Sequence, residues 1–128
     1  MSAATLGAIA PSFVSGDVPA AIAFYRDRLG FELRFAEPDA PFFAIVGRDA
    51  VQIFLKSEEG VAPAPNRTRH RHLRWDAYVY TADPDTLAAE YARSGVTFAT
   101  PLQDTQDGLR GFEIDDADGY RLFFGRPL

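Results

Sequence analysis

Two histidines, His70 and His72, are the first candidates for metal binding or acid–base chemistry. If their segment is extended, both rings point to the same side of the chain, which would form half of a metal site. Four arginines fall within residues 67–74, and their positive charge opposes the binding of a cation. We therefore predict a solvated basic linker, with an anion-binding patch and a metal or acid–base role as the alternatives.

Nucleophilic chemistry has little support in the sequence. The absence of cysteine excludes disulfides, thiolate nucleophiles and cysteine-bound zinc. Neither a G-x-S-x-G motif nor a phosphate-binding glycine loop is present. No histidine is placed to activate Ser12, Ser15, Ser57 or Ser94. We predict no catalytic residue and lean toward a protein that is not an enzyme.

One charged pair lies in a strand-like segment, residues 109–114. Arg110 and Glu113 differ by three positions, so they point to opposite faces of a strand and one faces the interior of a binding site. Glu113 facing inward would attract a cationic ligand, whereas Arg110 would favour a carboxylate or phenolate. The net charge of -5 favours Glu113 slightly. For either residue alone, an ordinary surface charge is the stronger interpretation.

Composition limits the partners and the location. The 128 residues fit one domain, and 47% hydrophobic with 24% charged residues is typical of a globular protein. The acidic balance argues against nucleic acid and anionic membranes as partners. No signal peptide or run of about 18 apolar residues is present, so we predict a soluble, cytoplasmic protein.

The sequence repeats itself after 65 positions. That shift superimposes Pro19 on Pro84 and Gly30 on Gly95, and it preserves apolar character at neighbouring positions. Asp17 and Asp83 are plausible N-caps of two helices, which the two glycines end. Strand-like segments occupy residues 9–15, 31–36, 42–46, 50–56, 75–81, 96–100, 109–114 and 120–125.

These elements make a βαβββ unit that is used twice, which predicts an α+β fold. We expect one domain over residues 1–128, with module one at about 8–57, a linker at about 58–72 and module two at about 73–126. Residues 115–119, Asp-Asp-Ala-Asp-Gly, have the composition of a turn. A Ca²⁺ site is the alternative there, but the spacing does not fit a 12-residue EF-hand loop.

Two motifs resemble a known family. SGDVPAAIAFYRDRLGF at residues 15–31 and DADGYRL at residues 116–122 are similar to the vicinal oxygen chelate superfamily, which includes glyoxalase I, bleomycin resistance proteins and extradiol dioxygenases. The resemblance covers nearly the whole chain and implies two curled sheets that form a cup. In the metal-dependent members, side chains on the first and last strands of each module bind a divalent ion.

The resemblance places those metal positions at Ala10, Ile53, Trp75 and Phe123, none of which has a donor atom for a divalent cation. We therefore predict no metal and no cofactor. If the assigned strand register is wrong by one residue, Gln52 or Phe54 takes the metal position given to Ile53, and Asp76 becomes a possible ligand. Even then a linker histidine would be needed to complete a site.

The cup is predicted to be apolar and aromatic. Strand alternation places Ser12, Ile53, Trp75, Ala77, Phe123 and Arg121 on its inner face, and Phe43, Phe54 and Glu113 complete the candidate ligand-binding set. Trp75 would offer a flat stacking surface to a planar or cationic ligand, unless it simply fills the space that a metal occupies in relatives.

Among the branches of the superfamily, the chain most resembles the bleomycin resistance proteins. That resemblance implies a metal-free homodimer that sequesters an aromatic or cationic antibiotic-like ligand in grooves lined by aromatic side chains of both subunits. Two alternatives stay open. One is a metal-dependent lyase, isomerase or dioxygenase of the glyoxalase type, and the other is a metal-independent enzyme that uses a cup carboxylate as a general base.

Overall fold

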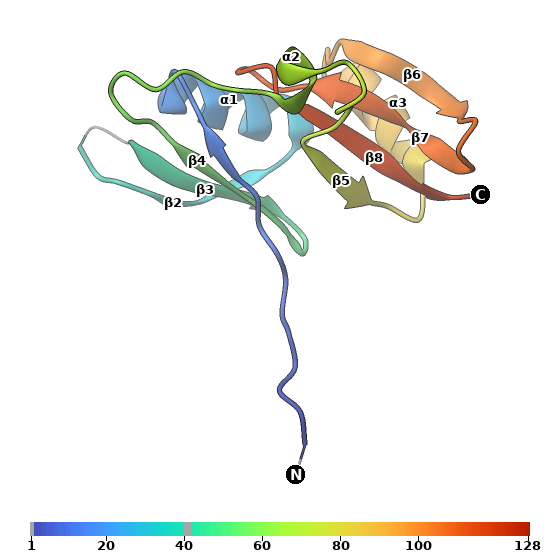
Figure 1. Ribbon diagram of the computed structural model, residues 1–128, viewed down its shortest axis with the longest axis horizontal. Coiled ribbons are helices and arrows are strands. Elements are labelled where there is room, and N and C mark those ends of the chain that lie inside the picture. The colour runs from blue at the N-terminus through green and yellow to red at the C-terminus, as the bar shows by residue number, and fades with distance from the viewer. Residues whose placement is uncertain (1, 40–41) are drawn as a thin grey trace.

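The repeat predicted from the sequence is present in the structure, a computed structural model that describes residues 2–39 and 42–128. Figure 1 shows two sheets side by side, each with its own helix. The elements, in chain order, are β1 (Ser12–Val14), α1 (Val18–Leu29), β2 (Glu32–Ala36), β3 (Phe43–Arg48), β4 (Val51–Lys56), α2 (Asn66–Arg69), β5 (Ala77–Tyr80), α3 (Pro84–Arg93), β6 (Phe98–Asp104), β7 (Leu109–Asp115) and β8 (Arg121–Pro127).

Both modules have the same topology, which confirms the α+β assignment. The strand order is β1-β4-β3-β2 in module one and β5-β8-β7-β6 in module two. The first strand of each module runs parallel to the last, and the remaining pairs are antiparallel. Helix α1 packs against β2, β3 and β4, and α3 against β6, β7 and β8. Each sheet therefore has a helix-covered face and an open face.

The helices begin and end where the sequence predicts. The Asp17 carboxylate accepts a hydrogen bond from the Ala20 amide at 3.0 Å, and Asp83 accepts one from the Thr86 amide at 3.1 Å. Gly30 follows α1 with a φ of 71°, a left-handed conformation that glycine adopts without strain. These caps fix the chain direction into the next strand of each module.

The first strand of each module is shorter than predicted. Residues 9–11 are not part of β1, because only Ser12 to Val14 pair with β4. The segment before them extends away from the body of the molecule (Figure 1), and its Leu6 and Ile9 side chains are 93% and 89% exposed. Strand β5 begins at Ala77, so Trp75 lies just before the strand.

The linker is more structured than its composition suggests. It contains α2, and the Asn66 amide donates to Asp76 Oδ1 at 2.8 Å. Arg67 donates to the Gly119 carbonyl at 3.2 Å and lies 3.5 Å from Asp115. The predicted turn is present, and the Asp116 amide donates to the Tyr120 carbonyl across it. These contacts attach the end of the linker to module two.

A single hydrophobic core spans both modules. The rings of Phe13 and Tyr120 are stacked with centroids 4.3 Å apart, and the buried Tyr25 hydroxyl donates to Asp116 Oδ2 at 2.6 Å. The Tyr91 hydroxyl donates to the Leu29 carbonyl at 3.1 Å. Burial holds the pKa of Tyr25 well above its usual value, so the hydroxyl keeps its proton for this hydrogen bond. No helix in residues 2–39 and 42–128 has the length and apolar character that a membrane span requires.

Candidate functional site

The open face of module two carries the site. Strand pairing sets Phe123 opposite Glu113 and Tyr78, so these three side chains share one face. Thr100 lies opposite Glu113 on β6. The neighbouring residues Phe112 and Phe124 point the other way and pack against Tyr91 of α3. The alternation of β7 and β8 therefore separates the site from the core.

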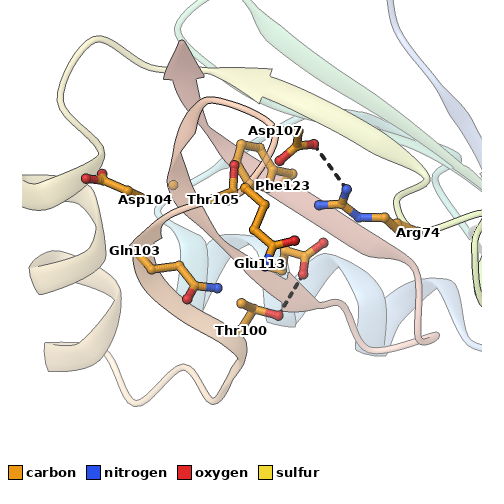
Figure 2. Close-up of a pocket in the computed structure, with 10 residues that line it drawn as sticks. Arg74, Thr100, Gln103, Asp104, Thr105, Asp107, Glu113 and Phe123 are labelled. Atoms are coloured by element: carbon orange, nitrogen blue, oxygen red, sulfur yellow. Dashed lines mark hydrogen bonds and ion pairs between the residues drawn. The ribbon is translucent and has the colours of Figure 1, made fainter. Parts of the chain in front are cut away.

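A groove of about 380 Å³ lies on this open face (Figure 2). It is called the module-two groove below. Its lining residues are Arg74, Thr100, Gln103, Asp104, Thr105, Gln106, Asp107, Gly111, Glu113 and Phe123. All of them lie within the predicted bounds of module two, so module one contributes nothing to the lining of this groove.

Glu113 is the buried charged residue of the groove. Its side chain is 7% exposed, and its Oε1 accepts a hydrogen bond from the Thr100 hydroxyl at 2.6 Å. Its Oε2 is buried and has no hydrogen-bond partner among the described residues. Arg110 points to the opposite side, where it binds both carboxylate oxygens of Asp85 at 2.8 Å. Of these two charged residues, Glu113 therefore faces the groove.

Three aromatic rings gather beside Glu113, and they are called the aromatic cluster of module two below. The Trp75 and Phe123 centroids are 5.0 Å apart, and Tyr78 lies 5.3 Å from Trp75 and 5.0 Å from Phe123. Phe123 is only 1% exposed, whereas Trp75 and Tyr78 are half-buried. The guanidinium carbon of Arg74 lies 4.9 Å from the Trp75 ring centroid, a cation–π contact.

Two glycines make room for the Phe123 ring. Gly111 and Gly125 lie opposite each other on β7 and β8. A Cβ atom on Gly111 would lie 2.6 Å from Phe123 Cζ, and one on Gly125 would lie 2.5 Å from Phe123 Cε1. The ring therefore lies over the glycine pair, a position that any other residue type at these sites would obstruct.

Arg121 is on the same open face, but its charge is neutralised. Its Nε and Nη2 atoms donate to the two oxygens of Asp115 at 2.8 and 3.1 Å. These bonds raise the pKa of the Arg121 guanidinium, which stays protonated. A ligand would meet an ion pair here and not a free cation.

The open face of module one is aromatic and more exposed. The pairing places Ser12, Phe54 and Ile45 in one row, which continues to Phe35 on β2. Phe43 joins this face, with its ring 5.6 Å from Phe54 and 6.0 Å from Phe35. The predicted positions of Ser12, Phe43 and Phe54 thus come together, but on a different sheet from Glu113 and Phe123.

The predicted inward orientation of Ile53 is wrong. It pairs with Val46, is 1% exposed and belongs to the hydrophobic core beneath α1. Ala77 also belongs to the helix side of its sheet, where it packs against the core. In β4 and in β5, the residue on the open face is one position after the predicted one. Phe54 lies there in place of Ile53, and Tyr78 in place of Ala77. The sequence pattern did not identify Tyr78 as a site residue. Its pairing with Phe123 is what places it on this face.

A second groove, of about 520 Å³, lies between the modules. Residues 8–11, residues 50–53 and residues 77–80 line it, and Ala, Val, Ile and Tyr side chains predominate. Gln52 is one of its polar residues. This groove is separate from the module-two groove, with no lining residue in common.

The residues present do not fit the divalent metal that some relatives bind. Trp75 and Phe123 pack against each other, and their rings offer no donor atom. Asp76, which a register shift would recruit, already accepts the Asn66 and Arg121 amides at 2.8 Å. Within the part of the chain that the structure describes, no three His, Asp or Glu side chains gather in a way that could hold a metal ion.

The histidines lie outside both grooves. His70 and His72 are exposed with ring centroids 5.1 Å apart, and the His72 amide donates to His70 Nδ1 at 3.1 Å. His70 immediately follows α2 in the linker. The predicted basic linker describes this segment well, since three of its arginines are exposed.

Comparison with known proteins identifies the family but no curated relative. A family model described as the Glyoxalase/Bleomycin resistance protein/Dioxygenase superfamily matches residues 6–124. A search of curated proteins finds no match.

Solved structures confirm the fold. The bleomycin-binding protein of bleomycin-producing Streptomyces verticillus, solved with copper(II)-bleomycin, is 28% identical with a TM-score of 0.72, over 99% of this chain and 100% of that one. TioX from Micromonospora sp. ML1 is 20% identical with a TM-score of 0.72, over 95% and 99%. A glyoxalase-related enzyme from Clostridium phytofermentans is 14% identical with a TM-score of 0.74, over 98% of each chain. With its doubled βαβββ unit and a family match over nearly its whole length, the chain belongs to the Glyoxalase/Bleomycin resistance protein/Dioxygenase superfamily.

Proposed function

We propose that this chain is a metal-free binding protein that sequesters a small aromatic or cationic organic ligand. One observation carries the proposal: the place where metal-dependent relatives need donor atoms is filled by the packed rings of Trp75 and Phe123, whose planes are tilted by 32°. Such rings supply apolar contact area and stacking, which hold a ligand without transforming it. The similarity to a bleomycin-binding protein along the entire chain supports the same class of function.

The charge of the module-two groove suits a cationic ligand. Glu113, Asp104 and Asp107 line it, and Arg74 is its one lining cation among the described residues. Asp107 binds Arg74 at 3.2 Å and Asp104 binds Arg110 at 3.0 Å, so the negative charge of Glu113 is the excess charge of the groove among the described residues. This excess would draw a cation toward the aromatic rings.

The working form proposed is a homodimer. Phe35 and Phe42 are 47% and 51% exposed on module one, and the module-two groove has no lining from module one within the chain. If the aromatic face of one subunit covered the module-two groove of its partner, both surfaces would be buried and the site would be enclosed. We place the protein in the cytoplasm, since a chain without cysteine needs no oxidising compartment.

A second candidate function rests on Glu113. A buried carboxylate with a free oxygen beside an apolar surface could act as a general base toward a bound small acid or ketone. This enzyme would consume its ligand, whereas the binding protein would return it unchanged.

Titration with bleomycin separates the two candidates. Trp75 is the sole tryptophan, so its fluorescence reports binding at the aromatic cluster of module two. We expect saturable quenching, a stoichiometry of one ligand per chain by calorimetry, and recovery of intact bleomycin by mass spectrometry. Absence of binding to bleomycin and to a panel of planar aromatic cations would refute sequestration, and a modified product would favour the enzyme.

A further inference from the structure

The free oxygen of Glu113 is the least satisfied polar atom in the module-two groove. The carboxylate is 93% buried, as its 7% exposure shows, and the Thr100 hydroxyl serves only Oε1. A buried charged oxygen without a donor is unfavourable, because it has lost its hydration and gained nothing in exchange. Its position therefore indicates that a donor is supplied from outside the chain.

The nearby cations of the protein are already engaged. Arg121 is held by Asp115 through two hydrogen bonds, and Arg74 is held by Asp107. Neither donates to Glu113 Oε2, which has no partner among the described residues. A cation that reaches this oxygen would supply its first hydrogen-bond donor among the described contacts.

The ring of Phe123 lies directly opposite Glu113 across β7 and β8. Trp75 and Tyr78 extend the aromatic surface away from that ring. Phe123 is the aromatic residue that lines the groove together with Glu113, so a ligand that donates to Oε2 has its next atoms beside this ring. Planar groups that carry N–H donors match this combination, because they stack with one part and donate with another.

We propose that Glu113 selects ligands in which a cationic N–H group, such as an amidinium or guanidinium, is joined directly to a planar aromatic ring. The N–H donates to Glu113 Oε2, and the ring lies against the aromatic cluster of module two. This inference rests on the proposed binding function and adds the chemical class of its ligand.

A series of four small probes tests the inference on the full chain. Benzamidinium has a cationic N–H, benzamide a neutral N–H, acetophenone no N–H donor, and benzoate an added negative charge. We expect affinities to fall in that order, with benzamidinium at least about tenfold tighter than acetophenone, because hydrogen bonds to charged groups contribute this much. Amide chemical shifts and Trp75 fluorescence measure the binding.

Two variants identify the group responsible. Glu113→Gln keeps the shape of the side chain but removes its charge, and it should reduce the benzamidinium affinity about tenfold while leaving acetophenone unchanged. Glu58→Gln makes the same chemical change at an exposed loop position outside the groove and should alter neither affinity.

The outcomes separate this inference from the function on which it rests. Equal binding of benzamidinium and acetophenone, or an unchanged benzamidinium affinity in Glu113→Gln, would overturn the role of Glu113 and leave aromatic binding intact. Binding of none of the probes, together with no binding of bleomycin, would overturn both. If Glu113→Gln fails to fold, the order of the four probe affinities on the unmodified chain still tests the role of Glu113.

Discussion

At the scale of single residues, the glycine pair beneath Phe123 sets the shape of the aromatic cluster of module two. At Gly125, a Cβ would lie 2.5 Å from the Arg110 carbonyl oxygen as well as from the ring. Because a backbone atom cannot rotate away, the strand itself would have to shift. The cluster therefore depends on two positions that carry no side chain at all.

Gly125→Ala should destabilise the fold and disturb Trp75 together. Overpacking of this kind lowers the free energy of unfolding by about 1–3 kcal/mol, which urea unfolding measures. Gly7→Ala is the matched control, since a Cβ there meets no atom within 4 Å. An unchanged unfolding midpoint with unchanged Trp75 emission in Gly125→Ala would contradict the role of this glycine in seating the Phe123 ring.

Asp116 gives the fold a specific pH dependence. Burial raises its pKa from 3.8 to about 6, although the hydrogen bond from Tyr25 opposes the shift. The folded chain then binds a proton more tightly than the unfolded chain, so this group favours folding at low pH and loses that contribution as pH rises from about 4 through about 6.

The variant Asp116→Asn should lack this dependence. We expect the unmodified chain to lose up to about 3 kcal/mol relative to Asp116→Asn between pH 4 and pH 7, since each pKa unit corresponds to about 1.4 kcal/mol. Urea unfolding of both proteins across this range measures the difference. A difference that stays constant with pH would contradict the raised pKa.

At the scale of elements, helices were easier to predict than strand faces. Asp17 with Gly30, and Asp83 with Gly95, mark the helix ends by local chemistry that needs no partner. Faces depend on pairing, and alternation identifies them only when one face is polar. In β4, the apolar Val51, Ile53 and Leu55 alternate with Gln52, Phe54 and Lys56, so the strand's own pattern places Ile53 in the core. The register taken from the family resemblance pointed the other way.

Counting residues from the sequence motifs located the candidate positions along the chain. It did not determine which face of the strand each side chain occupies. The spacing from the glycine at 119 correctly placed Phe123 on the open face of β8. The equivalent of Phe123 in module one was assigned to Ile53, one residue away from Phe54, which lies on the open face of β4. The contact between Trp75 and Tyr78 was likewise out of reach, since it depends on where β5 begins.

An ion pair connects β3 to α3 and joins the two modules. Arg48 donates to both oxygens of Glu90, at 2.6 and 3.0 Å, and to the Leu29 carbonyl at 3.0 Å. The hydrogen bonds raise the pKa of Arg48 and lower that of Glu90. Both side chains are about one-third exposed, so solvent screens the pair.

A double-mutant cycle with Arg48→Ala and Glu90→Ala should give a modest coupling of about 0.5–1 kcal/mol in unfolding free energy. We expect the coupling to decrease at high salt, because the pair is partly solvated. Coupling above about 3 kcal/mol would mean that the pair is far less hydrated than its exposure indicates, and zero coupling would remove it as a link between the modules.

At the scale of the whole molecule, the chain leaves much apolar surface uncovered. Phe35 and Phe42 are about half exposed, and Leu6 and Ile9 are almost fully exposed on the N-terminal segment. Surfaces of this kind on a small protein indicate an interaction site. They are the main reason to expect that the binding site is completed by a second copy.

Phe35→Glu should convert the predicted dimer to a monomer, because a charge would have to be buried in an aromatic interface. Sedimentation velocity at about 50 µM measures the mass of both proteins, and Glu58→Gln provides the control for an added change in charge. A monomeric unmodified chain at this concentration would contradict the proposed assembly.

The most direct test of the account is the metal content of the full chain. The untagged protein is incubated with Zn²⁺, Ni²⁺, Mn²⁺ or Fe²⁺, freed of excess ion and analysed for bound metal. Because rings occupy the positions where relatives carry ligands, we predict close to zero metal per chain, with bleomycin binding retained. About one tightly bound metal per chain would contradict the account and make a metal-dependent enzyme the better description.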